Sequence, residues 1–199
     1  MKKKCLVMLG TLLVLLGLIS VAVAETAPPK DLKKHTKAGK YVTSLEAYEM
    51  WKINPDKVKI LDCRIQEEYA YVGHANMAHS IPSRLWVGKW NEEKKDYDLQ
   101  DNPTFEAQVK RKFSQSDTIL VMCRSGHRSA SSVDRLTKVG FTNVYNIIDG
   151  FEGDKIKDEE SYLNGKRMKN GWKNSGAPWT YDLDSKLIYT NLTYKLAAP

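Results

Sequence analysis

The chain has 199 residues, 42% of them hydrophobic and 28% charged, which is the composition of a globular protein with one core. Its 12 Gly and 7 Pro are too few for a low-complexity chain, and no segment recurs at the fixed period of a solenoid. Removing the lysines at 2–4 from 31 Lys and Arg leaves 28 against 24 acidic residues, a net charge of +4 with interleaved signs, which argues against nucleic-acid binding.

The amino terminus has the three parts of a secretory signal peptide. Lysines stand at 2–4, an apolar run covers 6–19, and small residues at Ala22 and Ala24 precede a cleavage site. We therefore expect residues 1–24 to be removed, which leaves a periplasmic or secreted protein with no stable membrane insertion. The alternative is an uncleaved anchor, because the apolar stretch runs on to Ala24 and approaches spanning length. Cleavage is favoured, since a polar segment with two prolines follows at once.

The first half of the chain contains three expected elements after a polar stretch. Residues 25–40 are rich in Lys and have no core-forming period, which predicts a tether. A capping box over 43–46 predicts a helix that runs through Trp51. A strand is expected over 58–62, and a short edge strand over 80–82, where a proline ends it.

Helices and strands alternate in the second half. We expect a helix over 102–113, a strand over 118–122, a helix over 129–139 and a strand over 144–148. The strand over 118–122 is apolar throughout, which is typical of a strand buried on both faces of a parallel sheet. The pattern predicts an α/β fold with its site at the carboxyl ends of the strands.

A cysteine occupies that position. Cys123 ends the most apolar strand, and the next six residues lead directly into a helix, where the helix dipole and loop amides favour thiolate over thiol. Arginines and a histidine add positive charge, and a glycine permits a tight curl. The expected substrate-binding loop is Arg124, Ser125, Gly126, His127, Arg128 and Ser129. A cysteine at a strand end is commonly just a small buried apolar residue, but this basic loop has no evident packing purpose, so we favour a catalytic nucleophile.

These residues resemble the rhodanese-like (single-domain) sulfurtransferase family, in an exported form. Residues 123–129 are similar to its active-site loop, and 146–151 and 171–179 to its closing glycine turn and tryptophan segment. The family's first signature resembles Asp62-Cys63-Arg64, Glu68-Tyr69, Gly73-His74-Ala75 and Ile81-Pro82.

The resemblance implies a small parallel-sheet domain with helices on both faces. We place it over 41–181, followed by a C-terminal extension over 182–199 whose residues 187–194 have strand composition and are expected to add an edge or pair with another chain. The stretches 86–116 and 153–170 are longer than a minimal domain needs. They are expected to form loops around the crevice that affect substrate choice.

The resemblance also implies a reaction. Cys123 would take a sulfane sulfur from a small sulfur-containing anion or a persulfide donor, hold it as a persulfide, and pass it to a thiol or other thiophilic acceptor, which could be a protein, with no metal or other cofactor. A sulfur carrier or redox-binding module with little turnover is the main alternative. A cysteine phosphatase or arsenate reductase of related fold is disfavoured. Only four residues separate Cys123 from Arg128, whereas phosphatases of related fold have five residues between their cysteine and arginine.

Several roles stay open at this level. Arg124 and Arg128 are both suited to bind an anionic donor, but Arg128 could instead clamp the loop to a carboxylate. Cys63 is either an inert buried thiol or a redox partner that forms a disulfide with Cys123. The residues expected to brace the crevice are an ion-pair set and a turn histidine: Asp62, Arg64, Glu68 and His74. No His or Cys spacing matches a metal site.

Overall fold

The computed structural model describes residues 26–190. The expected signal peptide and cleavage site therefore lie outside the described residues. Within 26–190, no helix is both long and apolar enough to cross a membrane.

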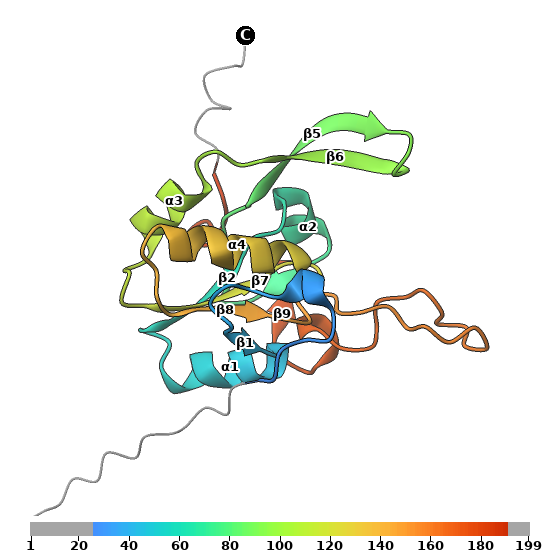
Figure 1. The fold of residues 1–199 in the computed structure, drawn as a ribbon, viewed down its shortest axis with the longest axis horizontal. Helices are drawn as coiled ribbons and strands as arrows, with labels where there is room; N and C mark the ends of the chain where they lie inside the picture. The colour runs from blue at the N-terminus through green and yellow to red at the C-terminus, as the bar shows by residue number, and fades with distance from the viewer. Residues whose placement is uncertain (1–25, 191–199) are drawn as a thin grey trace, which may run out of the picture.

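A five-stranded parallel sheet forms the centre of the molecule (Figure 1). Its order across the sheet is β1 (Tyr41–Val42), β8 (Val144–Ile147), β7 (Thr118–Met122), β2 (Val58–Asp62) and β4 (His79–Ser80). The predicted α/β class is confirmed. Because β7 is the middle strand, the residue that follows it lies at the centre of the sheet's carboxyl edge.

Helices cover both faces of the sheet, as predicted. Alternate residues of β7 separate two cores: Leu120 and Met122 pack toward α1 (Ser44–Ile53), whereas Ile119 and Val121 pack toward α3 (Phe105–Lys112) and α4 (His127–Lys138). The short α2 (Gln66–Tyr71), η1 (Leu32–Lys34) and η2 (Trp172–Asn174) complete the helical elements of residues 26–190. Each large apolar side chain buried this way contributes about 1.5–3 kcal/mol.

The predicted elements recur with small shifts. The capping box is present, with the Glu46 carboxylate accepting from the Thr43 amide at 2.7 Å. Helix α4 starts at His127, two residues before the predicted start. The edge strand β4 ends before Ile81, and α3 begins three residues after Asn102, whose side chain instead accepts the amide of Thr104 at 3.0 Å.

Two predictions about the ends of the domain differ from the structure. The segment expected as a tether contains η1 and packs on the domain, with Lys34 only 6% exposed. Residues 187–190 form no strand, although the Leu187 carbonyl accepts the Ser80 amide at 2.8 Å, and residues 191–194 lie outside the described part. Both segments are attached to the domain by isolated long-range contacts, which are hydrogen bonds and, for the N-terminal segment, ion pairs as well. Isolated contacts leave no periodic pattern in a sequence.

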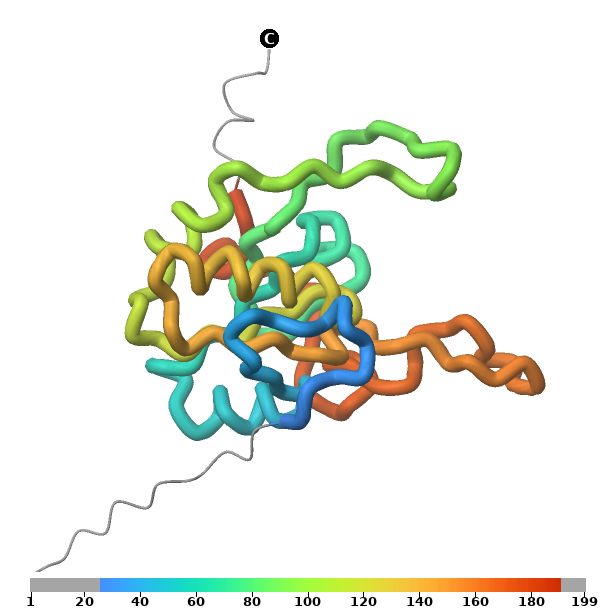
Figure 2. The backbone as a smooth tube through the Cα atoms, viewed as in Figure 1, coloured from blue at the N-terminus to red at the C-terminus, as the bar shows by residue number. Residues whose placement is uncertain are grey.

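Three further pairings lie outside the central sheet. Strands β3 (His74–Ala75) and β9 (Trp179–Thr180) form a short antiparallel pair. Strands β5 (Arg84–Asn91) and β6 (Asp96–Asp101) form an antiparallel hairpin where an irregular loop was expected. Residues 153–170 form a long loop that contains an isolated antiparallel β-bridge between Lys155 and Arg167. The β5–β6 hairpin and this loop project to the same side of the molecule (Figures 1 and 2).

Candidate active site

Cys123 lies at the carboxyl end of β7 and is 1% exposed. Its sulfur accepts the backbone N–H of Gly126 at 3.2 Å and lies 3.4 Å from the Ser129 hydroxyl. A thiol this deep in the fold is reached only from the open side of its own loop. The loop conformation therefore decides its chemistry.

Gly126 gives the loop its curl and caps α4. Its φ of +95° lies in the left-handed region, and a Cβ there would overlap the carbonyl of Ile148, so only glycine fits. The next three amides, of the first helical turn, have no partner within the helix and carry its partial positive charge. The site of Cys123 is therefore an anion-binding nest at a helix N-terminus.

The carbonyl groups at the start of the loop accept hydrogen bonds from the turn that follows β8. The amide of Phe151 donates to the Cys123 carbonyl at 2.8 Å, and the amides of Glu152 and Gly153 donate to the Arg124 carbonyl at 2.9 and 3.2 Å. With these carbonyls occupied by the turn after β8, the loop is held by backbone hydrogen bonds. A rigid nest of this kind is preorganised for negative charge.

A buried amide supports the nest from behind. The side chain of Asn146, fully buried on β8, accepts the Ser129 hydroxyl at 2.7 Å and donates to the carbonyls of Gly126 and Lys34 at 3.1 and 2.9 Å. Asn146 therefore joins β8, the Cys123 loop and the N-terminal segment. Sequence analysis missed it; the signal was a polar residue inside an apolar strand.

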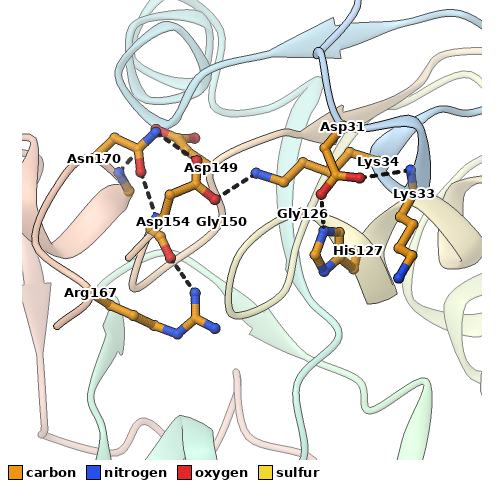
Figure 3. Close-up of polar contacts among 12 residues, drawn as sticks. Asp31, Lys33, Lys34, Gly126, His127, Asp149, Gly150, Asp154, Arg167 and Asn170 are labelled. Atoms are coloured by element: carbon orange, nitrogen blue, oxygen red, sulfur yellow. Dashed lines mark hydrogen bonds and ion pairs between the residues drawn. The ribbon is translucent and has the colours of Figure 1, made fainter. Parts of the chain in front are cut away.

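The N-terminal segment lies across the loop, as Figure 3 shows. The His127 ring contacts the Asp31 carboxylate at 2.6 Å, and the Lys34 ammonium contacts Asp154 at 2.8 Å. Arg167 donates to the carbonyl of Gly153 at 2.7 Å. Residues far apart in the chain thus meet at the loop, and sequence analysis had no signal for these contacts.

The Arg128 side chain pairs with a carboxylate outside the loop. Its guanidinium makes two hydrogen bonds of 2.6 Å to the carboxylate of Glu68 on α2, and each side chain is 17% exposed. Burial raises the pKa of Glu68, but the hydrogen bonds and charge of Arg128 outweigh it and hold the pKa below its usual value. Of the two roles left open for Arg128, the geometry favours the clamp. Arg124, by contrast, is exposed at the mouth of the site.

The residues predicted to form one ion-pair set belong to two separate pairs: Glu68 pairs with Arg128, and Asp62 pairs with Arg64. Arg64 pairs with Asp62 through bonds of 2.7 to 3.0 Å, donates to the Gly73 carbonyl at 2.7 Å, and lies 4.2 Å over the Phe151 ring. Both members of this pair are fully buried, so they brace the turn beneath the loop without reaching substrate.

His74 lies away from the loop. Its Nδ1 is 3.0 Å from the Tyr69 carbonyl, and its ring stacks on the Tyr69 ring with centroids 3.8 Å apart. Burial lowers the pKa of His74, which keeps the imidazole neutral at pH 7. These contacts match a turn histidine.

Cys63 follows β2, the strand that pairs with β7, and belongs to the same buried cluster as Cys123. Both cysteines are free thiols. Burial raises the pKa of Cys63 to about 12, and the neighbouring Cys123 adds to the effect. Cys63 is thus protonated near neutral pH, when a nucleophile would have to be thiolate.

Cys123 opens into a cavity of about 550 Å³. One side is formed by the loop and by the Glu68 and Arg128 pair. The β5–β6 hairpin contributes Trp86, Tyr97 and Leu99 to the same lining. Within residues 26–190, no cluster of three or more His, Cys, Asp or Glu side chains could hold a metal ion.

Comparisons with known proteins place this site in context. The Rhodanese-like domain family matches residues 46–157. An uncharacterised protein of Rickettsia conorii is 31% identical over 140 residues, 70% of this chain and 96% of that protein. The chloroplast thiosulfate sulfurtransferase 16 of Arabidopsis thaliana is 37% identical over 95 residues, 47% of this chain and 70% of that protein. The crystal structure of Rv0390 from M. tuberculosis aligns with a TM-score of 0.56 and 27% identity, covering 72% of this chain and 100% of that one.

Proposed function

Because the chain belongs to the rhodanese-like domain family, we propose that it is a sulfurtransferase that carries a sulfane sulfur as a persulfide on Cys123. The similarity to a thiosulfate sulfurtransferase supports the reaction class. The observation that carries the proposal is the position of the Cys123 sulfur. It accepts a hydrogen bond from the Gly126 amide at 3.2 Å, in a nest that opens into a cavity.

In the first half-reaction, the Cys123 thiolate attacks the outer sulfur of thiosulfate. A bond forms between the two sulfurs, the bond to the sulfonate breaks, and sulfite leaves with the electron pair. The electron pair that the thiolate donates is balanced by the pair that leaves with sulfite, so no external oxidant or reductant is required. The terminal sulfur of the persulfide then carries negative charge, which the amides of the first α4 turn stabilise.

The arginines support transfer of sulfur over transfer of phosphate. A phosphatase loop needs a guanidinium that binds the tetrahedral oxyanion, whereas both terminal nitrogens of the Arg128 guanidinium donate to the Glu68 carboxylate. Arg124 is exposed at the mouth, where its charge would raise the local concentration of an anionic donor. We assign Arg124 to donor capture and Arg128 to support of the loop.

We further propose that the reaction takes place outside the cytoplasm. The proposal rests on the sequence of residues 1–24, with its basic, apolar and small-residue parts in order. The acceptor there would be a thiol or another thiophile. Neither location nor acceptor depends on the assignment of Cys123.

The test is the intact mass of the protein, from Glu25 onward, after exposure to thiosulfate. We expect the mass to rise by one sulfur atom, and the gain to disappear after treatment with a thiol. Cys123→Ser should show no gain, whereas Cys63→Ser, the matched control, should gain one sulfur. A gain that requires Cys63, or no gain with thiosulfate or polysulfide, would overturn the proposal.

A further inference from the structure

One wall of the Cys123 cavity is apolar and comes from the inserted hairpin. We propose that this wall binds the organic group of a low-molecular-weight thiol, so that the acceptor is a neutral thiol with an aromatic or alkyl substituent. The inference rests on the proposed function, because it names the substrate class of the same site. It is carried by the hairpin's register, its exposed rings and the size of the cavity.

The hairpin gathers four apolar side chains on one face. Trp86 pairs with Leu99, and Trp90 pairs with Tyr97, so all four share a face. The register shifts between the two pairs, where Gly88 takes a φ of +68°. This irregularity bends the hairpin near the cavity and keeps both tryptophans on the same side.

The rings are held in position before any ligand arrives. The Tyr97 ring lies edge-on to Trp86 and to Trp90, with centroids 5.2 and 5.4 Å apart. All three rings are nevertheless about half exposed, at 45% to 46%. Three exposed aromatic side chains in one row are unusual for a side that packs on nothing, and they mark a binding surface.

The cavity is larger than an inorganic donor needs. If each heavy atom takes about the volume of a water molecule, ~30 Å³, thiosulfate occupies on the order of 150 Å³. The cavity is about 550 Å³, within the range of pockets that hold organic ligands of moderate size. The remaining volume is large enough for an organic substituent, and Trp86, Tyr97 and Leu99 are among the residues that line it.

Charge along the cavity favours a neutral substituent. The basic lining residues, Arg124, His127 and Arg128, all belong to the loop beside the sulfur. Away from the loop the charged lining residues are all acidic: Glu68 is paired with Arg128, and Glu67 and Asp96 remain. A thiol whose far end carries a carboxylate would be repelled there, whereas a phenyl or alkyl group contacts Trp86 and Leu99.

The second half-reaction then balances without a further reagent. The acceptor thiol first gives its proton to the anionic terminal sulfur of the Cys123 persulfide, and the thiolate so formed attacks that sulfur. A new sulfur–sulfur bond forms on the acceptor, the bond to Cys123 breaks, and Cys123 leaves as thiolate. The product is the acceptor's persulfide, and one sulfur and one proton have moved.

The test compares two thiols of nearly equal acidity, 2-mercaptoethanol and phenylmethanethiol, with thiosulfate as donor and sulfite release as the measurement. We expect kcat/KM for phenylmethanethiol to be at least tenfold higher, since each buried methylene is worth about threefold to fourfold. Trp86→Ala should lower this ratio about tenfold. The matched control is Val87→Ala, which removes apolar atoms from the same strand at a residue outside both the cavity lining and the ring row, and which should leave the ratio unchanged.

Three results would overturn the inference. Equal kcat/KM for the two thiols, with normal persulfide formation on Cys123, would refute the wall while leaving the proposed function intact. An equal loss of ratio in Trp86→Ala and Val87→Ala would mean that the effect comes from the hairpin fold and not from the wall. A change in the sedimenting mass of Trp86→Ala, with no change in ratio, would make the wall a self-association surface. Absence of any persulfide would instead refute the proposed function.

Discussion

Replacing Arg128 by alanine leaves the carboxylate of Glu68 without its charge partner at the base of the active-site loop. The carboxylate keeps one backbone hydrogen bond, from Ile65 at 3.2 Å, and its side chain is 17% exposed. Removing one partner of a buried pair costs about 3–5 kcal/mol. Since water reaches part of this pair, we expect Arg128→Ala to lose about 2–4 kcal/mol of unfolding free energy at pH 7.

The pH dependence distinguishes this loss from ordinary loss of packing. The pKa of Glu68 is lower in the folded state than its ordinary value of 4.5, so its contribution to stability is full above that value and disappears as pH falls through the folded pKa. In Arg128→Ala the folded pKa of Glu68 rises. The stability gap between wild type and variant should therefore narrow as the pH falls from 7 through the folded pKa of Glu68.

Urea unfolding and persulfide formation, measured on the same samples, are the assays. A double variant, Glu68→Leu with Arg128→Met, should recover much of the stability because no charge is left unpaired. The control is Arg135→Ala, which breaks a pair with Glu106 at 2.6 Å outside the cavity lining and should cost stability while persulfide still forms. Unchanged stability in Arg128→Ala, with loss of thiosulfate use alone, would show that the guanidinium serves the donor.

Three other substitutions or treatments test the site. Gly126→Ala should destabilise the protein by about 2–4 kcal/mol in urea unfolding and block persulfide formation, because it combines a φ of +95° with a steric overlap; a stable, active variant would contradict this. A neutral alkylating agent at pH 7 should label Cys123 and spare Cys63, whose pKa is raised to about 12 by burial; equal labelling by peptide mass spectrometry would refute this. Asn146→Leu should lose about 1–3 kcal/mol in urea unfolding and slow persulfide formation, because the Lys34 carbonyl loses its donor and the Gly126 carbonyl keeps only the Ala130 amide; unchanged rates would remove Asn146 from the support of the loop.

The central fold was predictable because local patterns determine it. The apolar run over 118–122 can be satisfied only by burial on both faces, and the capping box at Thr43 is complete within four residues. The Cys123 loop was predictable for the same reason, since its glycine, charges and helix start are adjacent in sequence. Patterns of this kind operate over one or two turns of chain.

The contacts that hold the loop were not predictable from such patterns. Asn146 and Lys34 are 112 residues apart and meet through a single hydrogen bond. The bidentate pair of Arg128 and Glu68 spans 60 residues. One contact leaves no period in a sequence, and an exposed Lys and a buried one look alike until the fold brings an Asp beside one of them.

The hairpin was missed for a different reason. An insertion with alternating aromatic and charged residues has strand character, but β5 and β6 pair only with each other within the described part of the chain, and their register shifts by the irregularity at Gly88. A hairpin of two strands is marginally stable alone. A role for its aromatic row becomes apparent only once Trp86 and Tyr97 are known to line the same cavity as Cys123.

Chemistry and recognition are thus placed on parts of the molecule with different constraints. The Cys123 sulfur accepts the Gly126 amide, and the loop around it is held by the buried Asn146 and by the turn after β8, so most changes there would also disturb the sheet. The proposed acceptor wall lies on a hairpin outside that sheet, where Trp86 and Tyr97 are half exposed and changes cost little packing. In the proposed function the nest binds only a sulfur and its charge, so discrimination among thiols has to come from contacts beyond it. The hairpin wall lines the same cavity and would supply such contacts, which is why we assign acceptor choice to the insertion.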